Sequence, residues 1–211
     1  MSAKNGWSRR EFIQASCATC ALAAVPAPAL PAGLYLSPPR RVKDLHLVEA
    51  RHYEKLPNRK IRCKLCPREC VIDDQERGYC GVRENRGGTY YTLVHSRPVT
   101  YHVDPIEKKP LFHFLPGTMA FSIATVGCNV ECKFCQNWQI SQVRPEQVEA
   151  FDMPPEMVAE YAKESGSPTI AYTYTEPVIF QEYVYDTAVA GKKKGVRSVM
   201  ISNGFIQKDP M

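Results

Sequence analysis

MAFSIATVGCNVECKFCQNWQIS, residues 119–141, joins a compact apolar strand pattern to Cys128, Cys132 and Cys135. Three thiols are an unusual set, because a structural zinc site takes four ligands and disulfides use cysteines in pairs. A 4Fe-4S cluster on three cysteines leaves one iron with an open position, and catalysis needs an open position. The set therefore indicates a catalytic metal centre, with a zinc site that borrows His113 as the alternative.

Strand and helix patterns alternate after this motif. Residues 154–166 and 178–195 have helix patterns, and residues 169–175 and 196–202 have apolar strand patterns. Such alternation predicts parallel strands with crossover helices. The strands are too few to close a barrel, and the last would expose an apolar edge. We therefore expect residues 119–211 to form an α/β core, a partial, truncated parallel βα barrel.

A cysteine-rich module over residues 63–118 precedes this core. Its first part has few apolar residues and carries four cysteines in the spacing C-x2-C-x3-C-x9-C, namely Cys63, Cys66, Cys70 and Cys80. Four thiols in such a stretch predict a metal staple. Zinc and a second 4Fe-4S cluster are both open, and two disulfides are a third alternative. Residues 89–105 predict two short strands.

The first 32 residues form a separate segment. Arg9 and Arg10 precede an alanine-rich stretch that prolines interrupt. This pattern resembles a twin-arginine export signal, with a disordered alanine-rich tail as the alternative. The apolar run is too short to span a membrane. We therefore expect the periplasm or a membrane face, or the cytoplasm if the leader is not used, and no transmembrane span.

Residues 33–62 are expected to be a linker followed by a short helix, because Leu45, Val48, His52 and Leu56 recur at helical spacing. The formal net charge is +5, and part of it lies in the first 32 residues. The remainder is too small to indicate a nucleic-acid surface. Nucleic acid is therefore not expected as a partner.

The cysteine triplet and its surroundings resemble a known enzyme family. The triplet, with Phe134 before its last member, looks like the motif of the radical S-adenosylmethionine enzymes. The run DPIEKKPLFHFLPGT before residue 119 and the module's CKLCPRECVIDDQERGYCGVRENRGG resemble the AmmeMemoRadiSam-system enzymes, relatives of the pyruvate formate-lyase activating enzymes. The resemblance covers about residues 45–211.

This resemblance implies a reaction. The triplet would ligate a 4Fe-4S cluster, and S-adenosylmethionine would chelate the open iron. One electron would cleave the cofactor to methionine and a 5'-deoxyadenosyl radical, which abstracts hydrogen from an unknown substrate, with a protein as one candidate. Phe134 and Gln136 are expected beside the adenine.

The same resemblance assigns the strand ends. Glu176 stands where relatives carry a Gly-Gly-Glu turn that meets the methionine amino group, although Tyr174 and Thr175 replace the glycines here. Ser202 and Asn203 are expected to face the cofactor. All lie at carboxyl ends of predicted parallel strands, where sites in such folds are found.

Partners are implied only by the family. They are an electron donor such as a flavodoxin or ferredoxin, with Memo-type and AMMECR1-type proteins as further candidates. The rival interpretation is a non-catalytic iron-sulfur electron carrier or a zinc-binding structural protein. A carrier would supply four cysteines per cluster, and the triplet favours an enzyme. A radical SAM enzyme is therefore expected, and an inactive fragment is the alternative for this 211-residue form if the core is truncated.

Overall fold

The computed structural model describes residues 37–211. The predicted export signal over residues 1–32 lies outside the described residues. Residues 38–211 form one compact unit. Within the described range, no helix has the length and apolar character needed to cross a membrane.

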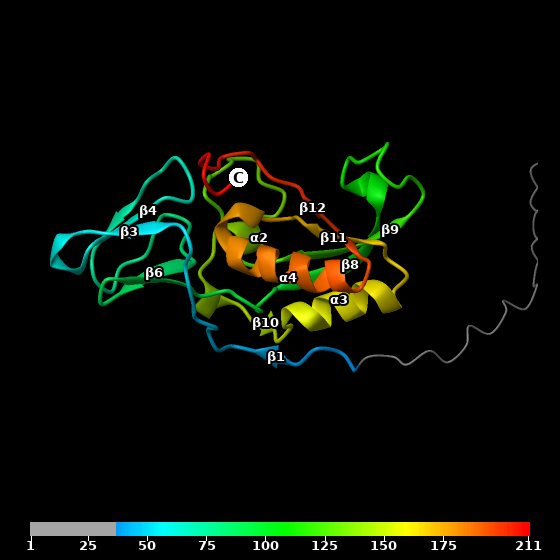
Figure 1. Cartoon of the computed structure of the whole chain (residues 1–211), viewed down its shortest axis with the longest axis horizontal. Coiled ribbons are helices and arrows are strands. Elements are labelled where there is room, and N and C mark those ends of the chain that lie inside the picture. The colour runs from blue at the N-terminus through cyan, green and yellow to red at the C-terminus, as the bar shows by residue number, and fades with distance from the viewer. Residues whose placement is uncertain (1–36) are drawn as a thin grey trace, which may run out of the picture. The chain divides into compact units, whose positions relative to one another are not determined.

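The larger sheet has the strand order β12-β11-β9-β8 (Figure 1). β9 (Met119–Ala124), β11 (Thr169–Tyr172) and β12 (Arg197–Met200) are parallel. β8 (Thr100–Pro105) joins β9 in antiparallel orientation. The predicted α/β class and the three parallel strands are confirmed, while the described strands form an open sheet in which no barrel is shown.

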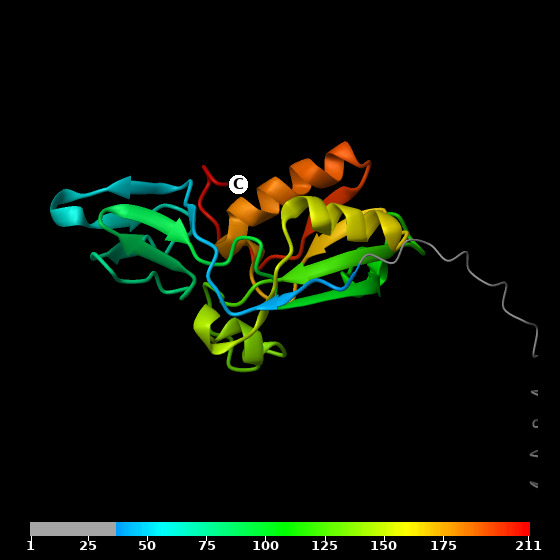
Figure 2. The ribbon, with the colours of Figure 1, turned by 90° about the horizontal axis from the view of Figure 1, so that it is seen from below.

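Two helices link the parallel strands and pack side by side on one face of the sheet (Figure 2). α3 (Pro155–Glu164) begins with a proline, whose missing N–H costs nothing in a first turn. α4 (Gln181–Lys193) follows the 3-10 turn η4 (Pro177–Phe180). Both helix predictions are confirmed, although the second pattern begins as a 3-10 turn.

The strand β9 is buried on both faces because its side chains alternate. Phe121 and Ile123 belong to the main core, which the two helices cover. Ala120 faces the opposite side, where it packs with Ile106 and Ala171. A buried central strand fixes the direction of the chain that leaves it. That chain, residues 125–137 with Cys128, Cys132 and Cys135, is called the cysteine loop.

Residues 48–92, which include the first part of the predicted module and the residues before it, contain two small antiparallel sheets. One has the order β3-β4-β5 and the other β2-β7-β6. Their strands are β2 (Val48–Glu49), β3 (Tyr53–Lys55), β4 (Ile61–Cys63), β5 (Val71–Ile72), β6 (Arg83–Arg86) and β7 (Thr89–Thr92). The predicted strands after residue 89 are confirmed as β7 and β8, but the helix predicted from Leu45 to Leu56 is wrong. A short helix is marginal alone, and here strand pairing replaces it, with the distant residues 91–92 for β2 and the nearby residues 61–63 for β3.

The remaining elements are short. β1 (Arg41–Val42) pairs with β10 (Ala150–Phe151), so part of the predicted linker is a strand. The others are η1 (Pro57–Arg59), η2 (Ile106–Lys108), α2 (Trp138–Ser141) and η3 (Pro145–Gln147).

The module has a small apolar cluster of its own, despite its composition. Ile61, Leu65, Ile72 and Tyr90 are buried in it, and η4 contributes Val178. Since Val178 belongs to the α/β core, the apolar cluster of the module includes a residue far along the chain.

A buried ion pair also joins the module to α4. The guanidinium of Arg83 pairs with the Glu182 carboxylate, and both side chains are 1% exposed. Arg83 Nε donates to the carbonyl of Ile179 at 2.9 Å, and the amide of Arg51 donates to Glu182 Oε1 at 2.9 Å. Burial by itself would raise the pKa of Glu182, but the Arg83 guanidinium outweighs it and holds the pKa below its ordinary value.

Removing one partner of this pair should be costly. Arg83→Met leaves a buried carboxylate without its cation and should lower the free energy of unfolding by roughly 3–5 kcal/mol. The double variant R83M/E182L removes both charges and should recover most of that loss. Urea unfolding at pH 7 measures both. Equal losses in the single and double variants would contradict a dominant role for the unpaired charge.

The same pair predicts a pH dependence. Because the folded-state pKa of Glu182 is lowered from 4.5, its contribution is present above that value and is lost as the pH falls through the folded-state pKa. Stability of the unaltered protein should therefore fall more steeply between about pH 5 and about pH 3 than that of R83M/E182L. Parallel pH profiles for the two proteins would refute this contribution.

Gly127 lies where β9 passes into the cysteine loop, in close contact with the module. Its φ is +94°, and an added Cβ would lie 2.6 Å from Val82 Cγ1 and 2.7 Å from the carbonyl oxygen of Cys80. Both the backbone conformation and the space therefore require glycine.

Gly127→Ala should destabilise the protein by more than the roughly 1 kcal/mol of backbone strain alone, because overpacking adds about 1–3 kcal/mol. Gly195→Ala is the matched control, since Gly195 has φ +76° but no atom within 4 Å of an added Cβ. Thermal unfolding compares them. An equal loss in both variants would mean that the close approach to the module carries no energy.

Candidate active site

The cysteine loop starts at the carboxyl end of β9 and is closed by backbone contacts. Cys128 and Cys135 are partly buried, whereas Cys132 is exposed. The amide of Gly127 donates to the carbonyl of Ile140 at 2.9 Å, which brings the start of the loop against α2. The loop is thus a defined turn of chain at the edge of the sheet.

Glu176 organises the ends of the next two strands. It is 3% exposed and accepts three hydrogen bonds: from the Val178 amide at 3.0 Å, the Ser202 hydroxyl at 2.7 Å and the Asn203 amide at 2.8 Å. Neighbouring parallel strands end at the same edge, and for this reason residues 26 and 27 positions apart meet here. The structure therefore brings together Glu176, Ser202 and Asn203, three of the predicted cofactor-binding residues.

Asn129 links this group to the cysteine loop, and the sequence analysis missed it. Its side chain is fully buried, accepts from Asn203 Nδ2 at 3.0 Å and donates to the carbonyl of Phe205 at 2.9 Å. Its carbonyl accepts from Arg68 Nε of the module at 2.7 Å. Spacing alone gave no signal for Asn129, because its partners lie far away in the chain.

Phe134 and Gln136 are not packed against this buried group. Phe134 is 91% exposed, and Gln136 is also exposed. Their predicted place beside an adenine is therefore not part of the geometry seen here. Both roles stay predictions.

The three thiols of the cysteine loop are the donor type that an iron-sulfur cluster needs, but their sulfur atoms do not point toward a common centre. Burial raises the pKa of Cys128, and the nearby Glu176 carboxylate raises it further. Across residues 37–211, no three Cys, His, Asp or Glu side chains stand close enough to hold a metal ion as they are. Three thiols in one loop nevertheless match the donor set of a 4Fe-4S cluster with one open iron. The residues fit that group, and their side chains would have to turn toward one another to hold it.

The four cysteines of the module line one small cavity. Its volume is about 20 Å³, and Cys63, Cys66, Cys70 and Cys80 all border it. Burial raises the pKa of three of these thiols, that of Cys80 to about 12. The structure thus places all four predicted ligands around a common space.

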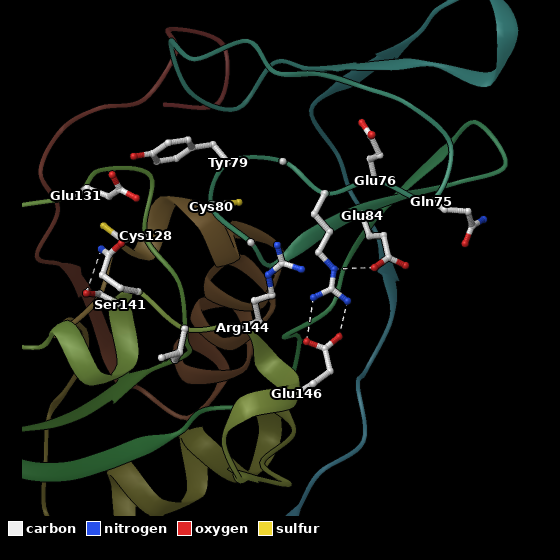
Figure 3. A pocket seen from close by; sticks show the side chains of 15 residues that line it. Gln75, Glu76, Tyr79, Cys80, Glu84, Cys128, Glu131, Ser141, Arg144 and Glu146 are labelled. Atoms are coloured by element: carbon white, nitrogen blue, oxygen red, sulfur yellow. Dashed lines mark hydrogen bonds and ion pairs between the residues drawn. The ribbon is translucent and has the colours of Figure 1, made fainter.

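A larger cavity of about 730 Å³ lies between the module and the loop (Figure 3). Cys80 and Cys128 both line it, so each cysteine set has a member at the same cavity. Across from them, Arg77 pairs with Glu84 and Glu146. A polar cavity of this size could take a small-molecule ligand.

A buried charged group supports the end of β11, and it too was missed. Lys109 Nζ donates to Asp104 Oδ2 at 2.7 Å, and the Tyr174 hydroxyl donates to the same oxygen. Burial would raise the pKa of Asp104, but donors from Lys108, Lys109 and Tyr174 hold it far below its usual value. Asp104 lies in β8, Lys108 ends η2 and Lys109 follows it, and Tyr174 lies in the turn after β11, so only the fold brings them together.

Tyr174 transmits this support to the cysteine loop. Its φ is +64°, a conformation that costs a non-glycine residue about 1–3 kcal/mol and persists only where the surrounding structure holds it. Its carbonyl accepts from Asn137 Nδ2 at 2.8 Å, just beyond the cysteine triplet. The strained tyrosine therefore fixes the second strand end against the loop.

This chain is similar in sequence to two proteins of Methanocaldococcus jannaschii. MJ0808, an uncharacterized protein of Methanocaldococcus jannaschii, is 47% identical over 163 residues, which cover 77% of this chain and 49% of the relative. MJ0674, an uncharacterized protein of the same organism, is 33% identical over 82 residues, which cover 38% of this chain and 19% of the relative. The chain thus spans about half the length of the first and about a fifth of the second. No solved structure matches it.

A family model matches the part of the chain that contains the cysteine loop. Residues 122–210 correspond to the Radical SAM superfamily. That range holds the whole cysteine loop together with β11 and β12. The match supports a relation of residues 122–210 to the radical SAM superfamily.

Proposed function

We propose that this protein is an enzyme that cleaves S-adenosylmethionine reductively to make a 5'-deoxyadenosyl radical. The observation that carries the proposal is the Glu176 group, buried at the ends of two parallel strands beside a loop with three cysteines. When bound to Cys128, Cys132 and Cys135, a 4Fe-4S cluster would supply one electron to the sulfonium. That electron would cleave the carbon-sulfur bond to give methionine and the 5'-deoxyadenosyl radical, which would abstract a hydrogen atom from the substrate.

Glu176 is suited to hold the amino group of the cofactor's methionine. An ionised carboxylate offers about four acceptor positions, and the amides and hydroxyl described above occupy three. About one position is left for an ammonium donor. Because the other three are fixed by backbone and by Ser202, the carboxylate is oriented before a ligand arrives.

Asn203 and Asn129 hold the neighbouring turn in place. The Asn203 carboxamide oxygen accepts from the amide of Phe205 at 2.8 Å, and its nitrogen donates to Asn129. Ser202 and Asn203 remain exposed at this turn, so they can also contact a bound ligand. Phe134 and Gln136, which are also exposed, would close over an adenine from the loop.

Finer assignments belong to the same proposal. The resemblance of the module and the DPIEKKPL run supports an enzyme of the AmmeMemoRadiSam type, related to the pyruvate formate-lyase activating enzymes. The parallel β9, β11 and β12 support a partial βα barrel. A flavodoxin or ferredoxin would donate the electron, Memo-type and AMMECR1-type proteins are candidate partners, and a twin-arginine leader would direct the protein to the periplasm or a membrane face.

The reaction can be tested on the 211-residue chain after anaerobic reconstitution with iron and sulfide. With dithionite and S-adenosylmethionine, 5'-deoxyadenosine should form, and Cys132→Ala should reduce it to background. Product from C132A at the rate of the unaltered chain would contradict the assignment of the loop. A bound cluster without any 5'-deoxyadenosine would favour the electron carrier instead.

Glu176→Gln tests the ammonium contact. It keeps the size of the side chain but removes its charge, and loss of about 1.5–3 kcal/mol should raise the KM for S-adenosylmethionine roughly 10- to 100-fold. Glu160→Gln is the control, since Glu160 is a partly exposed carboxylate that pairs with Lys194 on the surface. An unchanged KM in E176Q with intact folding would contradict the proposed contact.

Tyr174→Phe tests the support from the second strand end. The hydroxyl that donates to Asp104 is lost, so the KM for S-adenosylmethionine should rise roughly 3- to 10-fold while bound iron stays constant, as expected for about 1 kcal/mol. Tyr185→Phe is the control, because Tyr185 is exposed. A loss of stability in Y174F without a change in KM would mean that the residue is structural only.

A further inference from the structure

We propose that Cys63, Cys66, Cys70 and Cys80 bind one divalent ion of the zinc class, and that this ion holds the module against the cysteine loop. This inference goes beyond the proposed reaction and does not depend on it. The spacing of the cysteines allowed either zinc or a second 4Fe-4S cluster, and this inference selects zinc.

The size of the shared cavity favours a single ion. The cavity that the four cysteines border has a volume of about 20 Å³, and a site for one water-sized particle needs about 10–15 Å³. A 4Fe-4S cube contains eight metal and sulfur atoms and would have to push the lining apart. That lining includes the buried side chains of Leu65, Tyr90 and Ile179. Close-packed apolar residues resist such expansion.

Backbone turns deliver the four cysteines to this space. The amide of Cys63 donates to the carbonyl of Cys70 at 2.9 Å, and Cys66 lies in the turn between them. Cys80 comes from the turn in which the Gly81 amide donates to the carbonyl of Gly78 at 2.9 Å. Gly78 is needed there, because an added Cβ would lie 2.6 Å from the Tyr90 hydroxyl.

The four thiols border one cavity but do not point toward a common centre. Within residues 37–211, no three potential ligands stand close enough together to hold an ion. Since all four sulfur-bearing side chains border one cavity, rotation about their side-chain bonds is the change that the site requires. All described cysteines are free thiols, so no disulfide competes for these four in this structure.

Charge and ligand type both fit zinc. Thiolates select soft or borderline metals and disfavour calcium and magnesium. Four of them fill the tetrahedral shell of a structural zinc ion, which leaves no open position. The resulting site would carry two excess negative charges. Arg68 and Arg83, which also pairs with Glu182, line the cavity and can offset them.

The same module touches the cysteine loop at two points. Arg68 donates to the carbonyl of Asn129, whose side chain also contacts the Cys66 thiol. On the other side, Gly127 packs directly against the carbonyl of Cys80. Fixing Cys66 and Cys80 around one ion would therefore fix both contacts that surround Cys128.

Metal counting tests the site without any need for activity. The parent is the full chain with Cys128, Cys132 and Cys135 all changed to Ala, which removes the competing iron ligands. After reconstitution with zinc, elemental analysis should give one zinc per chain, and cobalt(II) in its place should give the absorption of a tetrahedral thiolate complex. Adding Cys66→Ser and Cys70→Ser should abolish both signals.

Three results would overturn the proposal. In the first, the parent binds iron and acid-labile sulfide in preference to zinc. In the second, it binds no metal and forms two disulfides. In the third, the variant with both Cys66→Ser and Cys70→Ser retains zinc. If that variant fails to fold, chelation of zinc from the parent decides. Removal should lower the melting temperature, and restored zinc should return it. No shift would contradict a stabilising ion.

Hydrogen exchange tests the coupling to the loop. Zinc removal should speed amide exchange at residues 125–137, while α3, which makes none of these contacts, provides the internal control. Unchanged exchange in the loop, with zinc demonstrably removed, would mean that the ion stabilises the module alone.

Discussion

The buried carboxylate of Glu176 is the interaction on which the candidate site depends. It accepts from the first turn of η4 and from the turn after β12, and so holds two strand ends at one edge of the sheet. Asn203 extends that network to Asn129, directly after Cys128. Substitutions at these residues should therefore have non-additive effects on the free energy of unfolding, because the residues share hydrogen-bond donors and acceptors.

The module and the α/β core are joined by interactions of a different kind. The Arg83 and Glu182 charges are desolvated, so breaking the pair costs more than making it gains. At Gly127 the constraint is steric, since the loop passes within van der Waals distance of the Cys80 carbonyl. Together they explain why residues 38–211 form one compact unit although their sequence reads as two parts.

Local patterns predicted the parallel strands and both helices. The family resemblance placed Glu176, Ser202 and Asn203 at strand ends, and the structure joins them because the ends of neighbouring parallel strands share an edge. Local patterns failed where strand pairing or side-chain contacts outside the local pattern determine the structure. Leu45 to Leu56 has helical spacing, yet it forms strands that pair with residues 61–63 and 91–92. Asn129, the Arg83 pair and the Lys109, Asp104 and Tyr174 group have no periodic signal, since each depends on contacts that only the folded chain creates.

The central claim is that S-adenosylmethionine binds at a cluster held by the three loop cysteines. Electron paramagnetic resonance of the reconstituted, reduced chain tests this most directly. Adding S-adenosylmethionine should change the spectrum of the unaltered protein, because a ligand then occupies the open iron, and should change that of E176Q only at higher concentration. A spectrum that S-adenosylmethionine leaves unchanged at saturating concentration would contradict the account.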